Sequence, residues 1–407
     1  MNHHRTTAIV IVGLGLLFAA TTAIAQSKTI TIGVLEDQSG LYADATGVGS
    51  TLATQMAVED SGLLQKNWKV NVISADHQNK ADIGSAIARK WFDVDNVDVI
   101  VGLGSSSVSL AVALVAKEKN KVAVVTSGAT SDLTGSACSP NTVHWTYDTY
   151  MLAKSTGTAV TKSGGKTWFF ITADYAFGAA LERDTTTAVE RAGGRVIGGV
   201  RHPLNTADFS SYLVQAQSSG ANVVAFANAG SDATNSIKQA AEFGLTKSKQ
   251  KIAALLMFIG DVKALGLDVA QGLNLTATFY WDLNEQTRGF SARFAKRMKN
   301  GAVPSMPQAG TYSGTLHYLK AAEALGGSVS DGAKVVAEMK VLPKDDPLFG
   351  KGEVRVDGRA IHPVYLFQVK TPAESKGPWD LYKLVETIPG SEGFRPLSEG
   401  GCALVKK

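Results

Sequence analysis

The sequence predicts an α/β protein with two lobes, each a parallel sheet flanked by helices. Short apolar, β-branched segments alternate with helical patterns through most of the 407 residues, which is typical of parallel sheets covered on both faces. The alternation breaks near Trp145–Asp148 and changes after Trp281-Asp282, where two helices follow with no strand between them. A chain of this length also exceeds what one hydrophobic core usually accommodates, so two cores are expected.

The predicted strands are short runs of β-branched and other apolar residues. Thr29–Leu35 reads TITIGVL, the composition expected of a strand buried on both faces. Similar runs follow at Lys69–Ala75, Val97–Val101, Val122–Thr126, Thr167–Thr172, Val196–Val200, Val223–Ala227, Ile252–Phe258 and Leu273–Tyr280.

Helical patterns fill the intervals between these strands, and the crossovers they form are right-handed by default. They cover Gly49–Asp60, Ile83–Asp93, Val108–Lys119, Thr149–Lys162, Ala179–Ala192, Phe209–Gln217 and Asp232–Phe243, with later helices at Thr287–Lys299, Gln308–Leu325 and Gly332–Lys340. A Pro- and Gly-rich stretch then precedes a tail that is expected to form antiparallel strands at Pro363–Lys370 and Leu381–Val385.

The first residues resemble an export signal. Arg5 precedes an apolar stretch, Ala8–Ala20, and the small-residue pattern Ala23–Ala25 follows it. A basic start, a short apolar segment and an A-x-A end are typical of a cleavable secretory signal. The apolar stretch is shorter than the roughly 20 residues of a spanning helix, although a retained membrane anchor is the alternative. We therefore expect residues 1–25 to be removed and the mature chain to be soluble and periplasmic.

Charge and cysteine content narrow the class further. Forty Lys and Arg residues against thirty-six Asp and Glu give a formal charge of +4, and no run of Lys or Arg exceeds two residues, so no nucleic-acid partner is indicated. Two cysteines, Cys138 and Cys402, cannot form a structural zinc site alone. In an oxidising compartment they are a candidate disulfide that would tie the C-terminal tail to a distant loop, with two free thiols as the alternative.

Two polar turns follow neighbouring predicted strands. Gly102–Ser107 (GLGSSS) opens a helix but lacks the third glycine of a dinucleotide fingerprint and the lysine of a phosphate-binding loop. Free N–H groups and the hydroxyls of Ser105 and Ser106 at a helix start can bind an anion such as a carboxylate, while simple helix capping is the alternative. Ser127–Ser131 (SGATS) ends the next strand, and adjacent parallel strands would bring both turns to one sheet edge, where ligands of open α/β sheets bind.

Patterns of catalysis and metal binding are absent from the sequence. No G-x-S-x-G occurs, so a hydrolase elbow is not indicated. The histidines of the mature chain show no metal-ligand spacing, and we expect neither a metal, nor another cofactor, nor enzymatic activity. These histidines are His77, His144, His202, His317 and His362.

Three further residues have both a ligand-binding and a structural interpretation. Tyr42 lies in a Gly-flanked loop after the first strand, where contact with a ligand is favoured over the core. Tyr175 could place its ring over a ligand or pack in the core, and Asp261 could contact a ligand or cap a helix.

Four segments together resemble a known family. They are Ile32–Gly40 (IGVLEDQSG), Met56–Asp60 (MAVED), Asn96–Gly102 (NVDVIVG) and Thr172–Gly178 (TADYAFG). In this order they are similar to the periplasmic solute-binding proteins of ABC importers, and most similar to the branched-chain amino-acid (Leu/Ile/Val-binding) type. The resemblance runs over essentially the whole mature chain.

The resemblance implies a type I periplasmic binding protein fold, a clamshell of two Rossmann-like lobes joined by three hinge crossings. The lobes would comprise residues 26–146 with 283–348, and residues 147–282 with 349–407. The chain would be a monomer that binds a small solute between its lobes and delivers it to a membrane permease. A ligand-sensing ectodomain and a secreted hydrolase are the alternatives from other classes.

The resemblance also implies roles for individual residues. In its pattern a second-lobe acid holds the ammonium of an amino acid, and here Asp261 lies near that place, although its apolar surroundings Met257–Gly260 depart from the pattern. An aromatic or other carboxylate, or an amide, is therefore the alternative ligand to a branched-chain amino acid. A ligand carboxylate would be held by Ser105, Ser106, Ala129 and Thr130 of the first lobe, with Tyr175 and Asn228 approaching from the second and Ser39 and Tyr42 on the rim.

Overall fold

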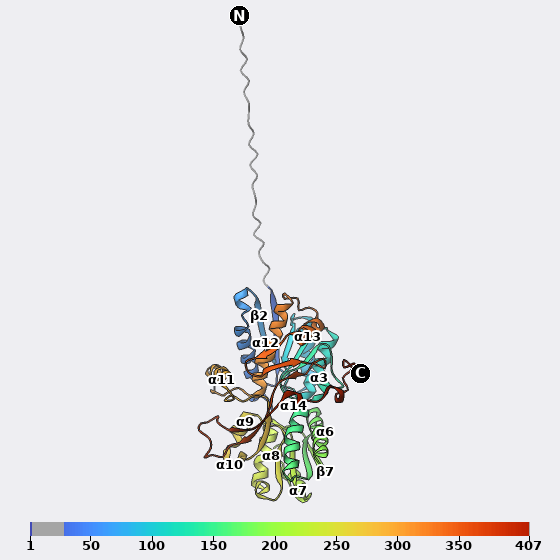
Figure 1. The fold of residues 1–407 in the computed structure, drawn as a ribbon, viewed down its shortest axis with the longest axis vertical. Coiled ribbons are helices and arrows are strands. Elements are labelled where there is room, and N and C mark those ends of the chain that lie inside the picture. Colours follow the sequence, from blue (N-terminus) through green and yellow to red (C-terminus); the bar gives the residue numbers. More distant parts are fainter. Residues whose placement is uncertain (2–27, 407) are drawn as a thin grey trace.

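The protein consists of two lobes placed one above the other along its longest axis (Figure 1). The structure is a computed structural model that describes Met1 and residues 28–406. One lobe contains α12 (Met306–Ala324) and the other contains α8 (Gly230–Glu242). Each has its own parallel sheet, so the predicted α/β class with two lobes is confirmed. The rest of the predicted signal segment, after Met1, lies outside the described residues.

The first lobe is built on a five-stranded parallel sheet. Its strands are β1 (Thr29–Glu36), β2 (Lys69–Asp76), β3 (Val99–Gly102), β4 (Val122–Val125) and β5 (Thr142–His144). They pair in the order β2-β1-β3-β4-β5. Side chains alternate between the two faces, so along β3 Val99 and Val101 join one core while Ile100 joins the other.

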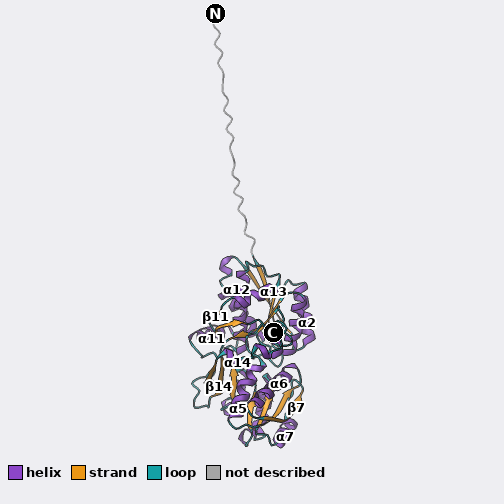
Figure 2. Cartoon of the chain, turned by 45° about the vertical axis from the view of Figure 1, so that its right-hand side comes forward, coloured by secondary structure: helices purple, strands orange, loops and turns teal. Residues whose placement is uncertain are grey.

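Helices cover both faces of this sheet. Trp91 and Val112, on two helices of one side, pack with Leu35, while Tyr318 and Val335 belong to the core of the other side. Figure 2 shows α2 and α12 on opposite sides of the lobe. The helices of this lobe are α1 (Gly47–Asp60), η1 (Leu64–Lys66), α2 (Ala81–Asp93), α3 (Ser106–Glu118), η2 (Ser131–Thr134), α11 (Glu285–Arg297), α12 and α13 (Gly332–Val341).

The second lobe repeats the plan with four parallel strands. They are β6 (Thr167–Ala173), β7 (Arg195–His202), β8 (Val223–Ala227) and β9 (Lys251–Ala254), paired in the order β7-β6-β8-β9. The single helix predicted over residues 149–162 contains a short π-helical segment, η3. The helices are α4 (Thr149–Leu152), η3 (Ala153–Gly157), α5 (Thr158–Lys162), α6 (Ala176–Arg191), α7 (Ser210–Ser218), α8, η4 (Leu245–Lys247), α9 (Ile259–Leu265) and α10 (Leu267–Ala270).

A third, antiparallel sheet corrects one expectation. The strand–helix alternation predicts parallel sheets, and Leu273–Tyr280 is among the predicted strands, but β10 (Asn274–Ala277) pairs antiparallel with β14 (Val364–Val369). β14 also pairs antiparallel with β15 (Tyr382–Ile388), which confirms the antiparallel tail. The partner of β10 lies far along the chain, and for that reason no local pattern around residue 274 identifies it.

Before its tail returns to the first lobe, the chain passes between the lobes three times, and the third passage differs from the expected place. Val354 and Ala360 pack in the core of the first lobe. The backbone of Arg359 forms an isolated parallel β-bridge with that of His144, at the end of β5. We therefore place the third crossing after Ile361 rather than between residues 348 and 349, where the expected lobe boundary lies. The remaining short elements are β11 (Lys344–Asp346), β12 (Gly350–Val354), β13 (Ala360–Ile361), α14 (Gly390–Gly393) and η5 (Leu397–Glu399).

Arg359 joins two of the crossings in the protein interior. Its guanidinium donates to the backbone oxygens of Trp145 (2.8 Å) and Tyr147 (3.2 Å), in the first crossing. Asp148, 3.5 Å away, is its ionic partner and also caps α4 by accepting from the backbone N–H of Met151. Both charged side chains are almost completely buried, so each depends on the other for compensation.

The end of the chain returns to the first lobe. Cys402 is bonded to Cys138, which lies in the loop after η2. Close by, the guanidinium of Arg395 donates to the backbone oxygen of Ser131 at 2.7 Å. The tail therefore belongs in part to each lobe, which differs from the expected assignment of residues 349–407 to the second lobe alone.

Replacing Arg359 with methionine tests the importance of this buried contact. Arg359→Met leaves Asp148 buried without its partner, so we expect the free energy of unfolding to fall by about 3 kcal/mol, measured by urea denaturation. The matched control is Arg201→Met, which removes an exposed pair with Glu182 and should change stability by less than about 0.5 kcal/mol. Equal effects of the two variants would contradict the role given to Arg359.

Candidate ligand-binding site

A small cavity lies between the lobes, where loops follow the carboxyl ends of strands from both sheets. This edge is where open α/β sheets bind ligands. Three loops of the first lobe meet three loops of the second, and the first crossing contributes one residue. The lining residues are Tyr42, Thr46, Gly104, Ser106, Ser127, Ala129, Tyr147, Tyr175, Phe177, Ala229, Leu256 and Phe258.

The two polar turns of the first lobe lie together, as the sequence predicts. Ser106 begins α3, and its hydroxyl accepts a hydrogen bond from the backbone N–H of Thr130 at 3.1 Å. Ser106 and Ala129 line the cavity, whereas Thr130 caps η2 by accepting from the N–H of Asp132. Ser105 precedes α3 as its N-cap residue, and its buried hydroxyl finds no hydrogen-bond partner among the described atoms.

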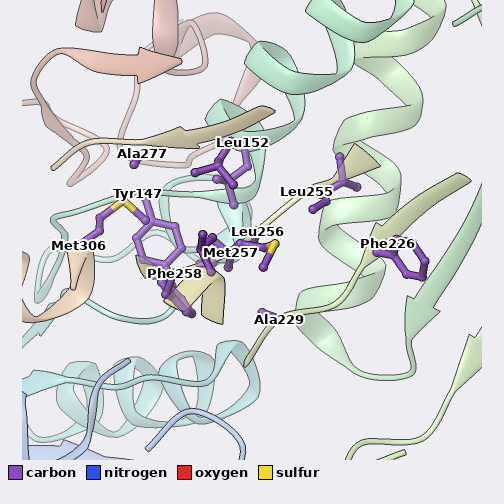
Figure 3. Packing of buried hydrophobic residues seen from close by; sticks show 14 of the residues in the cluster. Tyr147, Leu152, Phe226, Ala229, Leu255, Leu256, Met257, Phe258, Ala277 and Met306 are labelled. Carbon is purple, nitrogen blue, oxygen red and sulfur yellow. The ribbon is translucent and has the colours of Figure 1, made fainter. Parts of the chain in front are cut away.

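Aromatic side chains from both lobes and from the first crossing form much of the remaining cavity wall. The hydroxyls of Tyr42 and Tyr175 form a hydrogen bond across the gap between the lobes. Tyr147 packs edge-on against Phe258 at 6.2 Å between ring centres, as Figure 3 shows, and its hydroxyl donates to the backbone oxygen of Ser127 at 2.6 Å. Burial raises the pKa of Tyr42, Tyr147 and Tyr175, so all three hydroxyls remain neutral at physiological pH.

The lobes are closed on each other in this structure. The free volume of the cavity is only about 10 Å³, which is room for about one water molecule. Admission of a solute as large as an amino acid therefore requires separation of the lobes. Breaking the contact between Tyr42 and Tyr175 is part of that separation.

A larger groove runs along the surface beside this cavity. It has a volume of about 790 Å³ and lies between the start of α1 and α9, with Trp379 on its rim. Ala45 and Ile259 line it, and each is next in sequence to a residue of the cavity, Thr46 and Phe258. The two turns that carry the predicted hydrogen-bond donors open into the smaller cavity, which is therefore the better candidate site.

Besides Ser105 and Thr130, three predicted site residues lie outside the cavity lining. Ser39 is exposed on the rim and donates to the carboxylate of Asp76 at 2.5 Å. Asn228 is buried behind the cavity wall, where its amide donates to the hydroxyl of Ser236 at 3.2 Å. Asp261 accepts from the backbone N–H of Phe258 at 2.8 Å and so caps α9 instead of lining the cavity.

Glu36 was missed by sequence reasoning and lies directly behind the cavity wall. It is the last residue of β1, is completely buried, and accepts from the N–H of Gly104 (2.7 Å) and the hydroxyls of Ser127 (2.6 Å) and Ser50 (3.0 Å). Burial raises its pKa to about 8. Its place in the VLEDQSG segment gives no signal of burial, because acidic residues after a strand are usually solvated.

The glycines of the first turn make room for this carboxyl group. A Cβ atom on Gly102 or Gly104 would lie 2.6 Å from an oxygen of Glu36, which is closer than real Cβ atoms approach. Gly102 also has a φ of +100°, a conformation that other residues rarely adopt. The glycine spacing of the turn therefore serves the approach of Glu36 rather than the binding of a nucleotide.

Two general features of the described residues bear on the class of protein. Within residues 28–406, no group of three or more His, Cys, Asp and Glu side chains is placed to hold a metal ion. None of the helices in that range has the length and apolar character of a membrane span.

Comparison with known proteins identifies the family. The family model described as periplasmic binding protein matches residues 29–378. A crystal structure of a periplasmic binding protein from Burkholderia mallei is 49% identical, with a TM-score of 0.88 over 93% of this chain and 100% of that chain. The structure of a branched chain amino acid ABC transporter periplasmic ligand-binding protein from Burkholderia xenovorans is 39% identical, with a TM-score of 0.81 over 92% of this chain and 99% of that chain.

A curated relative agrees with these structures. It is the Leu/Ile/Val-binding protein homolog 6 of Brucella melitensis, which is 26% identical over 85% of this chain and 88% of its own length. The chain therefore belongs to the periplasmic binding protein family. Its relatives within that family include a branched chain amino acid ABC transporter component and a Leu/Ile/Val-binding protein homolog.

The position of Asp261 gives a test of its role. Asp261→Asn retains an oxygen that can accept from the N–H of Phe258 but removes the negative charge. We expect the variant to bind each ligand of the wild type with a Kd within about twofold, since a capping residue does not contact the ligand. Isothermal titration with L-leucine and benzoate checks this. A large, selective loss of leucine binding would show instead that Asp261 holds the ammonium group.

Proposed function

We propose that this protein is the extracytoplasmic solute-binding component of an ABC importer. It captures a small carboxylate-bearing solute between its lobes and presents it to a membrane permease. Its relatives include a ligand-binding component of an ABC transporter, which supports this role. We propose further that the protein acts as a monomer, without a cofactor and without catalysis. Removal of the signal segment would place it in the periplasm.

The division of the cavity into a polar and an apolar part is the observation that carries this proposal. Ser106, Ser127 and Thr46 line the first-lobe side next to Gly104, and the hydroxyl of Thr46 donates to the backbone oxygen of Tyr42. Phe177, Leu256 and Phe258 form the apolar side, with tyrosine hydroxyls between the two. Hydroxyl donors at one end and an apolar wall at the other suit a carboxylate with a hydrocarbon body.

Two ligand classes fit this division. A branched-chain amino acid is supported by the relatives, one of which is named as a branched chain amino acid transporter component. An aromatic carboxylate, another simple carboxylate or an amide is supported by the lining itself, because none of the cavity-lining residues in the described part of the chain carries a charge. An ammonium group would then lack an ionic partner, whereas a benzoate-like ring would pack against Phe177 and Phe258.

Closure of the lobes on the solute is the proposed mechanism, without covalent chemistry. Contacts that a solute makes with both lobes exist only in the closed state, so binding shifts the population toward it. The hydrogen bond between Tyr42 and Tyr175 forms in the same movement. Open and closed forms present different surfaces to the permease, which can thereby distinguish loaded from empty protein.

A thermal-shift panel with matched serine variants tests the proposal. L-leucine, benzoate and benzamide each at a hundredfold excess over Kd would stabilise the folded protein by about 2.7 kcal/mol if they bind only that state. We expect at least one carboxylate to raise the Tm of the purified wild type. No shift with any of the three would contradict the proposed ligand class.

The variants locate the carboxylate site. Ser106→Ala removes a cavity hydroxyl and should raise Kd about tenfold, the loss of about one hydrogen bond to a charged group. Ser39→Ala is the control, because the hydroxyl of Ser39 bonds to Asp76 outside the cavity and its removal should leave Kd unchanged. Titration calorimetry gives both values, and an unchanged affinity of Ser106→Ala would refute the anion site.

A further inference from the structure

The buried carboxyl of Glu36 is joined to the cavity through one hydroxyl. Ser127 both lines the cavity and contacts Glu36, with 2.6 Å between its Oγ and Oε1 of Glu36. The other contacts of Glu36, from the N–H of Gly104 and the hydroxyl of Ser50, are also hydrogen-bond donors. Ser50 belongs to α1 and does not line the cavity, so Ser127 is the side chain through which Glu36 can act on a ligand.

The charges around Glu36 do not compensate a negative charge. In the described part of the chain, no lysine, arginine or histidine forms an ion pair or hydrogen bond with its carboxyl group. The acidic neighbour in sequence is Asp37, which directly follows β1, and the titratable neighbour from the first crossing is Tyr147, which is neutral. The turn after β3 and helix α1 contribute Gly104 and Ser50, which are uncharged.

The protonation state of Glu36 determines whether the hydroxyl of Ser127 is a hydrogen-bond donor or an acceptor toward the cavity. When Glu36 is ionised, the hydroxyl hydrogen of Ser127 is donated to it, and the free lone pair of Ser127 makes the hydroxyl an acceptor toward the cavity. When Glu36 is protonated, its carboxyl O–H can donate a hydrogen bond to Oγ of Ser127. The hydroxyl hydrogen of Ser127 is then free to point at a ligand oxygen.

We propose that Glu36 is a positioning residue that holds a proton when an anionic ligand is bound and so keeps Ser127 a hydrogen-bond donor toward the ligand carboxylate. The inference rests on the proposed function, that the cavity takes a carboxylate. Binding of a carboxylate then requires the neutral form of Glu36, because two buried negative charges on either side of Ser127 would repel each other. The site can thus bind an anion without a lysine or arginine in its lining.

This coupling predicts a particular pH dependence of binding. The pKa of Glu36 is raised to about 8 by burial, so the free protein already carries the proton at lower pH. Affinity for a carboxylate should be constant below about pH 7 and fall about tenfold per pH unit above about pH 8, with one proton taken up from solvent per ligand bound. Below about pH 7 no proton should be taken up.

The experiment measures carboxylate binding by isothermal titration between about pH 6 and about pH 9.5, in two buffers with different ionisation enthalpies. The probes are benzoate and L-leucine. Glu36→Gln keeps a neutral hydrogen-bonding side chain and should bind with a pH-independent Kd and no proton uptake in the alkaline range. Ser50→Ala is the matched control, since it removes a contact to the same carboxyl outside the cavity and should retain the pH dependence.

A second measurement needs no ligand. A group with a raised pKa in the folded state contributes stability that is present below its unfolded pKa and lost as the pH rises through the folded pKa. The Tm of the wild type relative to Glu36→Gln should therefore fall as the pH rises from about 5 to about 8. If Glu36→Gln does not fold, proton uptake by the wild type on binding still decides the question.

Each result has a definite meaning. Wild-type binding without proton uptake near pH 9, or the same alkaline loss of affinity in Glu36→Gln, overturns the proposal. A pH-independent Tm difference between the two proteins also overturns it, whether or not a ligand binds. If neither probe binds the wild type, the proposed ligand class is refuted, and the Tm comparison alone decides whether Glu36 holds the proton.

Discussion

The buried contact of Arg359 with the first crossing is the constraint on which the arrangement of the lobes depends. A guanidinium completely removed from solvent must have all its strong interactions inside the protein. Arg359 finds them at the backbone oxygens of Trp145 and Tyr147, at Asp148 and over the ring of Phe394. These partners come from the first crossing and from the C-terminal segment, so Arg359 fixes the position of these two segments relative to each other. Tyr147 also lines the cavity, and its hydroxyl donates to the backbone oxygen of Ser127. Arg359 is therefore connected to the cavity through Tyr147.

The first-lobe side of the cavity shows the same need to satisfy buried polar groups. The two turns are held by the hydrogen bond between Ser106 and Thr130, and the carboxyl of Glu36 spans from the first turn to Ser127 of the second. The amide of Gly104 is already engaged by Glu36 and is therefore not free for a ligand. Ser106 and Ser127 also bring hydroxyls to this side of the cavity, and the orientation of each hydroxyl depends on its neighbours. Glu36 does not line the cavity, but through its contacts with Gly104 and Ser127 it influences which hydrogen bonds these lining residues can make to a solute.

Sequence patterns predicted the parts of this molecule whose signals are local. The nine apolar runs coincide with strands, eight of which lie in the two parallel sheets. The two polar turns meet because parallel strands end at one edge. The pairing of β10 with β14 was missed, since it joins segments about ninety residues apart. Asp261 was assigned to the site because a strand end suggests both roles, and only the position of the N–H of Phe258 distinguishes them. Glu36 was missed because its burial depends on Gly102 and Gly104, which lie in another strand–helix unit.

The contact that closes the cavity is too weak to explain closure by itself. One hydrogen bond between neutral hydroxyls, here Tyr42 and Tyr175, contributes about 1 kcal/mol. Reversing a two-state population from 1:99 to 99:1 requires about 5.5 kcal/mol of preferential binding to one state. Other contacts between the lobes add to it, among them the hydrogen bond of Ser131 to Asp184 and the ion pair of Arg183 with Asp132. A ligand that contacts the hydroxyls of the first lobe and the aromatic wall of the second together adds binding energy that only the closed state gains. A solute with both a polar and an apolar end therefore favours closure more than one with either end alone.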